Sequence, residues 1–168
     1  MRNIICLVSY SLMSISLLLV TQFSLVQSDA GLIAQTCKNT PHVDLCISSI
    51  KLNPNHRGTW DTATLASIIV DVIVVRSNAA VALIKKNPRS TGFPTCKQEY
   101  GFLLSDYLTE ARQALPGNPK FAQDGVRYMG GAATSCLRQL PSSSPVAGLS
   151  EQVRELSDIG SAIIQTLL

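Results

Sequence analysis

Four cysteines constrain what this 168-residue chain can fold into more than any other feature. They follow an apolar N-terminal segment, at positions Cys37, Cys46, Cys96 and Cys136. Pro41 lies between the first two, and Pro116-Gly117 lies midway between the last two. Because two helices joined by a short turn run antiparallel, residues equally distant from the turn come close together. Of the three possible connectivities, the spacing therefore predicts two nested disulfides, Cys37–Cys46 and Cys96–Cys136, each closing a helical hairpin.

The N-terminus has the three parts of a secretory signal peptide. Met1-Arg2-Asn3 is a positive start, residues 4–20 are apolar and uncharged, and Val26-Gln27-Ser28 is a small-residue exit. We predict that residues 1–28 are removed, together with Cys6, which leaves an even number of cysteines. A membrane anchor is the alternative, but serines interrupt the apolar run. No other segment is expected to be long and apolar enough to span a bilayer.

The remaining cysteines are expected to be oxidised, and neither a metal nor another cofactor is expected. An even cysteine count in a secreted chain favours disulfides, whereas zinc would require Cys and His ligands clustered at short spacing. The two histidines, His42 and His56, complete no such cluster. The formal net charge is +3, without a basic stripe, which argues against nucleic acid as a partner.

The chain beyond the leader has the periodicity of helices almost throughout. We predict helices over residues 61–86, 95–115, 119–140 and 149–167, after a short helical hairpin near residues 31–52. The connections between the helices are short, which places antiparallel neighbours side by side. The prediction is an all-α domain over residues 29–168, with the hairpin in 29–58 and an up-down-up-down four-helix bundle in 59–168.

The first long helix could be a strand by composition alone, because residues 68–75 are mostly β-branched. A helical stripe nevertheless continues well past ordinary strand length. The apolar positions of this stripe are Leu65, Ile68, Val72, Val75, Ala79 and Leu83. In the third helix, Gly125, Gly130 and Gly131 weaken the helix propensity and suggest a close approach of neighbouring helices.

No catalytic constellation is present in the sequence. Neither a G-x-S-x-G elbow nor an H-E-x-x-H motif occurs. His42 beside Pro41 and His56 in a polar linker are interpreted as solvated surface. The same interpretation applies to the carboxylates Asp106, Glu110 and Asp124 on exposed helical positions. We therefore predict that the protein is not an enzyme.

Several segments resemble the plant invertase and pectin methylesterase inhibitors. They are Thr36-Cys37 with eight residues to Cys46, Cys96 with Tyr100, Ala132-Ala133-Thr134-Ser135-Cys136, and the closing helix that ends Ala162-Ile163-Ile164-Gln165-Thr166-Leu167. The resemblance covers essentially the whole chain beyond the leader. It implies a four-helix bundle with an N-terminal hairpin, the same two disulfides, and a secreted protein that inhibits a carbohydrate-active enzyme.

Pro119-Lys120-Phe121 resembles the Pro-Lys-Phe motif by which invertase inhibitors enter the sucrose-binding cleft of their target. A lysine there would pair with the two carboxylates that a retaining glycosidase uses. Pro119 would stiffen the turn, and Phe121 would be an apolar anchor. The alternative is an ordinary helix start with Pro in the first turn, Lys solvated and Phe in the core.

The resemblance thus implies a secreted inhibitor that forms a 1:1 complex with an acid invertase in the cell wall or the vacuole. Neither nucleic acid nor, in the mature form, a membrane is an expected partner. An inhibitor of pectin methylesterase, acting through a broader helical face, is the alternative. A third class, an enzyme or a lipid-carrying helical protein, would need a catalytic site or a cavity.

Overall fold

The computed structural model describes residues 30–53 and 60–168. The predicted signal peptide, His56 and the last residues of the predicted hairpin lie outside the described residues. Every regular element within the described ranges is helical, beginning with a helix over residues 30–37. The labelled elements follow in chain order: α2 (Val43–Lys51), α3 (Thr62–Lys86), α4 (Phe93–Phe102), the π-helical turn η1 (Leu103–Tyr107), α5 (Leu108–Ala114), α6 (Pro119–Leu137) and α7 (Pro145–Gln165).

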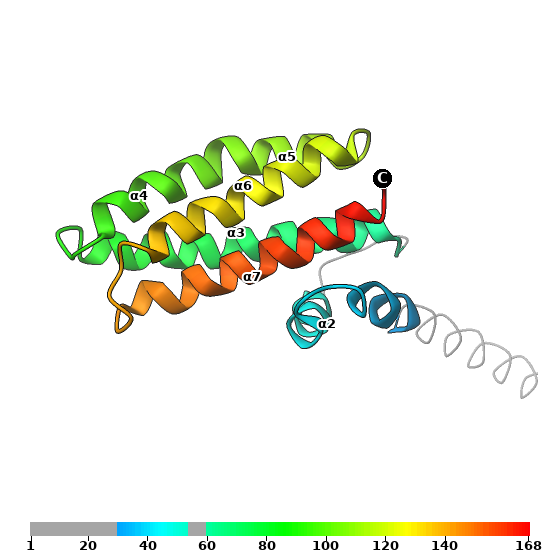
Figure 1. Ribbon diagram of the computed structural model, residues 1–168, viewed down its shortest axis with the longest axis horizontal. Helices are drawn as coiled ribbons and strands as arrows, with labels where there is room; N and C mark the ends of the chain where they lie inside the picture. Colours follow the sequence, from blue (N-terminus) through cyan, green and yellow to red (C-terminus); the bar gives the residue numbers. More distant parts are fainter. Residues whose placement is uncertain (1–29, 54–59) are drawn as a thin grey trace, which may run out of the picture.

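Figure 1 shows α3, α6, α7 and the continuous run of α4, η1 and α5 lying lengthwise beside one another. Helix α6 contacts α7 as well as α4 and α5, and α3 contacts the same set of partners, α7, α4 and α5. Short connections make successive helices antiparallel. The all-α, up-down-up-down bundle is therefore confirmed. The N-terminal hairpin lies to one side, where α2 contacts α3 and α7.

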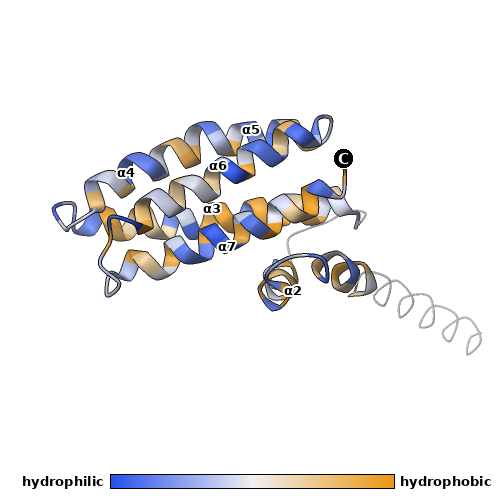
Figure 2. Ribbon diagram, in the orientation of Figure 1, coloured by the Kyte–Doolittle hydropathy of each residue, from blue (hydrophilic) through white to orange (hydrophobic). Residues whose placement is uncertain are grey.

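Helices α6 and α7 each bury one face. Figure 2 shows apolar and polar residues alternating along both, as expected for amphipathic helices. Their buried positions include Ala122, Gly125, Met129, Ala132 and Cys136 on α6, and Val153, Leu156, Gly160 and Ile163 on α7. These positions recur at intervals of three and four residues, the helical periodicity that the sequence predicted for both segments.

The buried stripe of α3 differs from the predicted one. Leu65 and Ile68 are buried, but Val75 is 64% exposed and Ala79 is also exposed. The second half of α3 instead buries Ile73, Ser77, Ala80 and Ile84. The predicted register was wrong because most residues from 65 to 75 are apolar, so several stripes fit the same helical period. The choice of helix over strand is confirmed.

Helix α3 also contradicts the expectation that no segment beyond the leader is long and apolar enough to cross a membrane. It has 25 residues and a mean hydropathy of 2.0 over its most apolar window. The bundle explains this composition, because α3 contacts α2, α4, α5 and α7 and buries residues among them. A helix with core neighbours on several sides is apolar over much of its circumference.

The ends of the last two helices differ from the predicted ones by a few residues. Helix α7 begins at Pro145 rather than near Leu149, because the Ser144 hydroxyl accepts a 3.3 Å hydrogen bond from the backbone N–H of Val146. A capping serine followed by proline is a favourable helix start. Helix α6 ends at Leu137, slightly earlier than predicted.

Both predicted disulfides are present. Cys37–Cys46 joins the end of the first helix to α2, with a Cα–Cα distance of 5.6 Å. Cys96–Cys136 joins α4 to α6, with a Cα–Cα distance of 4.5 Å. All four cysteines are fully buried, so each bridge is part of the core.

A buried tyrosine lies close to the second disulfide. The Tyr100 hydroxyl donates a 2.8 Å hydrogen bond to Ser150 Oγ, which lies 3.5 Å from Cys136 Sγ. Burial of the ring raises the pKa of Tyr100 to about 12, so the phenol stays neutral at physiological pH. The contacts among Tyr100, Ser150 and Cys136 hold α4, α6 and α7 together at the same height along the bundle.

Small residues on α6 permit close helix contacts, as the sequence suggested. A Cβ added at Gly125 would lie 2.9 Å from Ala111 N and 3.0 Å from Tyr107 O. These atoms belong to the backbone of α5 and η1, which cannot move without displacing a helix. A Cβ at Gly131, in contrast, would meet nothing within 4 Å.

The glycines give a matched pair of substitutions. We expect Gly125→Ala to destabilise the protein by about 1–3 kcal/mol, because overpacking against backbone forces a shift. Gly131→Ala should stabilise it by up to about 1 kcal/mol, because alanine is the better helix former. Urea unfolding followed by circular dichroism measures both. Equal effects of the two substitutions would contradict the close approach of α5 and α6.

The two disulfides should contribute unequally to stability. In the chain-entropy model the bridge across a sequence separation of 40 contributes about 4 kcal/mol, and the bridge across 9 contributes about 3 kcal/mol. Replacing Cys96 and Cys136 together by alanine should therefore lower the free energy of unfolding more than replacing Cys37 and Cys46. Urea titration of the two double variants tests this order, and the reverse order would refute it.

Candidate functional site

The Pro119-Lys120-Phe121 motif forms the first turn of α6, at the end of the bundle where α5 turns into α6 (Figure 1). Asn118 caps this turn, since its side-chain oxygen accepts a 3.2 Å hydrogen bond from the backbone N–H of Phe121. The backbone N–H groups of Gly117 and Asn118 donate to the Ala114 carbonyl, at 3.0 and 2.7 Å. The motif is therefore held on a capped helix start rather than on an open loop.

Lys120 lies at the exposed start of the helix. Its side chain is 59% exposed, and its Nζ lies 2.7 Å from Asp124 Oδ1, one helical turn further on. Asp124 was expected on a solvated helix face, and its pair with Lys120 was not predicted. The spacing of four residues was the signal for this pair.

Phe121 points away from the core. It is 54% exposed, and the next residue, Ala122, takes the buried position instead. The alternative interpretation of the motif is wrong in placing the phenylalanine in the core, whereas its proline in the first turn and its solvated lysine are both present. An exposed phenylalanine beside an exposed lysine presents both an apolar surface and a cation.

The exposed aromatic surface continues along α6. Tyr128 is also 54% exposed, and its ring centroid lies 5.3 Å from that of Tyr107 in η1. A hollow of about 300 Å³ lies beside it, lined by Asp124, Arg127 and Tyr128. We call the set formed by Lys120, Phe121, Asp124, Arg127 and Tyr128 the outer face of α6. Arg127 and Tyr128 were not predicted to belong to the site, although Tyr128 follows Phe121 by two helical turns.

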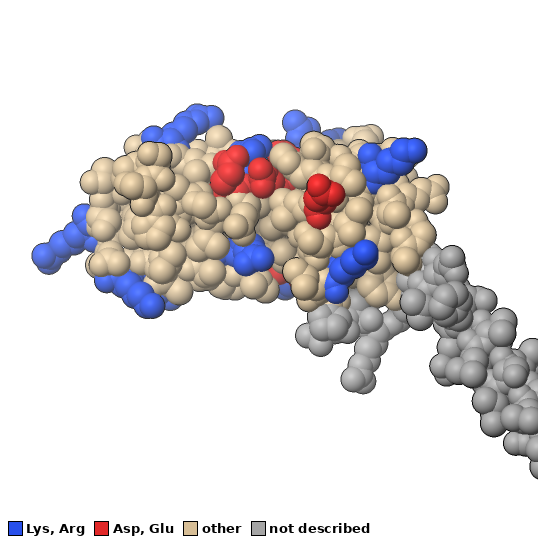
Figure 3. Space-filling model, turned by 90° about the horizontal axis from the view of Figure 1, so that it is seen from below, with Lys and Arg blue, Asp and Glu red and all other residues tan. Residues whose placement is uncertain are grey.

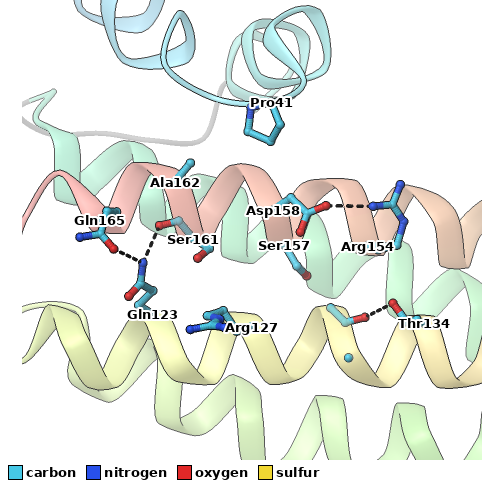
Figure 4. Close-up of a pocket in the computed structure, with 12 residues that line it drawn as sticks. Pro41, Gln123, Arg127, Thr134, Arg154, Ser157, Asp158, Ser161, Ala162 and Gln165 are labelled. Atoms are coloured by element: carbon cyan, nitrogen blue, oxygen red, sulfur yellow. Dashed lines mark hydrogen bonds and ion pairs between the residues drawn. The ribbon is translucent and has the colours of Figure 1, made fainter.

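A larger groove of about 680 Å³ runs between α6 and α7, with Pro41 of the hairpin at its edge (Figure 4). Several polar groups within it bond within the protein, whereas Arg127, which also lines it, makes no ion pair in residues 30–53 and 60–168. Gln123 Nε2 donates to Ser161 O at 3.2 Å and to Gln165 Oε1 at 2.8 Å. Arg154 binds Asp158 at 2.9 Å. The groove is thus crossed by bonds that join α6 to α7 and successive turns of α7.

The ionisable groups around this groove form ion pairs and hydrogen bonds with one another. The Arg154 guanidinium also hydrogen-bonds Glu151 at 2.5 Å, which lowers the pKa of that carboxyl and raises the pKa of the arginine. His42, the residue before α2, has its Nδ1 3.9 Å from Glu155 Oε1. These contacts hold surface groups in place and bring no nucleophile next to a base.

In the described part of the chain, no group of three or more His, Cys, Asp or Glu residues could hold a metal ion. Figure 3 shows one face of the molecule, with acidic side chains grouped near its middle and Lys and Arg side chains dispersed over the face and around its margin. Much of this face is uncharged, and the basic side chains form no continuous stripe on it.

Comparison with known proteins agrees with the geometry of the bundle. The family described as "Plant invertase/pectin methylesterase inhibitor" matches residues 31–163. The chain is 32% identical over 142 residues to the "Cell wall / vacuolar inhibitor of fructosidase 1" of Arabidopsis thaliana, which covers 81% of this chain and 69% of the relative.

A solved structure has the same fold. The crystal structure of mutant form A of a pectin methylesterase inhibitor from Arabidopsis superposes with a TM-score of 0.65 and 18% sequence identity. The match covers 77% of this chain and 92% of that one. On the family match over most of its length and the identity to an inhibitor, this chain belongs to the plant invertase/pectin methylesterase inhibitor family.

Proposed function

We propose that this protein is a secreted, non-catalytic inhibitor of a plant acid invertase, a β-fructofuranosidase of the cell wall or vacuole. The observation that carries the proposal is the exposure of Lys120 and Phe121 together on a capped helix start. The identity to a relative named as an inhibitor of fructosidase supports the choice of target. Its name also supports the cell wall or vacuole as the location.

Lys120 is the group proposed to enter the target's cleft. A retaining glycosidase holds its nucleophile and its acid/base carboxyl about 5 Å apart, flanking the bond that it cleaves. An ammonium group between them would pair with these carboxylates and occupy the position of the sugar. One such motif in each chain suits a 1:1 complex with one cleft.

Binding requires Lys120 to leave Asp124. An exposed ion pair one helical turn apart is worth about 0.3–0.5 kcal/mol, so separating the two groups costs little. Truncating one partner of a buried, hydrogen-bonded charge pair costs about 2–5 kcal/mol of binding. That cost is what is lost when Lys120 is removed, much of it from the carboxylates left unpaired, and the pair with Asp124 is too weak to hold Lys120 back.

The neighbouring residues lower the entropic cost of binding. Pro119 has a fixed φ angle, and the Asn118 side chain holds the backbone of the motif through Phe121 N. A turn that is already ordered loses little freedom when it binds. Phe121 then adds apolar contact area beside the charge.

Substitution of Lys120 tests the proposed site. Lys120→Ala should weaken inhibition of an acid invertase about thirtyfold or more, because the cleft carboxylates lose their partner. Lys97→Ala, at an exposed position on α4, is the matched control and should leave inhibition unchanged. Both variants should remain folded by circular dichroism, since exposed substitutions change stability by about 0.5 kcal/mol or less.

The same variants are titrated against a pectin methylesterase. Equal inhibition of the invertase by folded Lys120→Ala and by the wild-type protein would remove Lys120 from the site. Inhibition of the methylesterase alone would assign the protein to the second target of its family.

Neutralising Asp124 should have the opposite effect. In Asp124→Asn the ammonium of Lys120 has no carboxylate to leave, so inhibition should become about twofold tighter, as expected from an exposed pair of about 0.3–0.5 kcal/mol. The gain should disappear in the double variant with Lys120→Ala. Inhibition constants measured at low ionic strength provide the comparison, and weaker inhibition by Asp124→Asn would show that Asp124 itself assists binding.

A further inference from the structure

We propose that the enzyme-binding surface continues from Lys120 along the outer face of α6, and that Tyr128 is its second anchor. This inference rests on the proposed function, because the partner is the same acid invertase. It differs from that proposal in assigning binding energy to a residue two helical turns outside the Pro-Lys-Phe motif.

The three residues of the motif offer too little surface for a stable complex. A stable protein complex buries about 800 Å² on each partner and involves about 20–30 residues a side. A fully buried aromatic side chain contributes about 150–250 Å². Pro119, Lys120 and Phe121 together fall well short of such an interface. The contact must therefore continue onto exposed surface adjoining the motif.

One further exposed aromatic residue lies on the same helix as the motif. Among the described residues, the large exposed hydrophobic side chains are Val43, Leu52, Val75, Phe102, Phe121, Tyr128 and Leu168. Within this set only Tyr128 shares α6 with Phe121. Seven residues on a helix are close to two turns, so the two rings lie on the same side, about 10 Å apart along the axis.

Tyr128 is already held in place by the ring of Tyr107. Its ring is tilted by 37° against the Tyr107 ring at a centroid distance of 5.3 Å, which restricts the side chain before any partner arrives. Tyrosine offers a large contact area with few rotatable bonds and is enriched among residues that dominate binding. A pre-ordered, half-exposed tyrosine has the properties of such an anchor.

One basic side chain beside Tyr128 is free to bind a carboxylate of the partner. The hollow beside it is lined by Arg127 and Asp124. Arg127 is exposed and makes no ion pair with any residue in 30–53 or 60–168. Its guanidinium is therefore available to a carboxylate at the rim of the cleft that Lys120 enters. Arg127 also lines the larger groove between α6 and α7 (Figure 4), but Gln123, Arg154 and Asp158 in that groove already bond within the protein.

Three aromatic substitutions and one chemical measurement test this surface. Tyr128→Ala should weaken inhibition of an acid invertase about tenfold or more, the range for loss of an anchor residue. Tyr128→Phe keeps the ring contact with Tyr107 and should stay within about threefold of the wild type. Phe102→Ala removes an aromatic that is 43% exposed on α4 and should leave inhibition within about twofold.

Nitration of the wild-type protein gives a readout that does not depend on a variant folding. Tyr128 should react with tetranitromethane in the free protein and become protected in the complex with the invertase, as mapped by mass spectrometry. The surface is refuted if folded Tyr128→Ala inhibits like the wild type, if Phe102→Ala loses as much as Tyr128→Ala, or if Tyr128 is nitrated equally in the complex.

The parallel Lys120→Ala variant separates this inference from the proposed function. Weaker inhibition by Lys120→Ala without an effect of Tyr128→Ala would reject the extended surface and keep the Lys120 site. An effect of Tyr128→Ala on the invertase without one of Lys120→Ala would keep the surface and reject the cleft-entering lysine. A Tyr128→Ala effect confined to a pectin methylesterase would reject the surface for the invertase.

Discussion

The Cys96–Cys136 bridge is the constraint on which the rest of the bundle depends. It ties α4 to α6 with their Cα atoms 4.5 Å apart, near the short end of the range that a disulfide spans. The bond between Tyr100 and Ser150 brings α7 to the same level. With α6 fixed against α4 at this level, Gly125 can lie against the backbone of η1 and α5, and the first turn of α6 is placed at the far end of the bundle.

Much of this architecture could be predicted from the sequence because its signals are local and strong. The symmetric spacing of cysteines about prolines predicted both disulfides, and the helical periodicity of the sequence predicted α6 and α7. The stripe of α3 could not be predicted in the same way. Where apolar residues surround a helix, the face that each neighbour covers depends on the packing of the whole bundle, as the exposure of Val75 shows.

The candidate site was predictable as a segment but not as a surface. The sequence located Pro119-Lys120-Phe121 at a helix start, but Phe121 could face either the core or the solvent until the position of α6 was known. The rotation of α6 settled this, because Ala122 and Gly125 are the residues that fit against its neighbours. The same rotation of α6 leaves the pair of Lys120 with Asp124 at the surface. It also places the Tyr128 ring, tilted, against the Tyr107 ring.

The exposure of the first turn of α6 separates the residues that stabilise the protein from the surface proposed to bind its partner. The bundle is held by buried cysteines, glycines and apolar side chains, whereas Lys120 and Phe121 contribute little to it because both are largely in solvent. Substitutions at these two positions leave the core intact, so a lineage can change or lose its target without losing its fold. On the proposed function, the solvent-facing positions of such a scaffold can change while its buried core is kept.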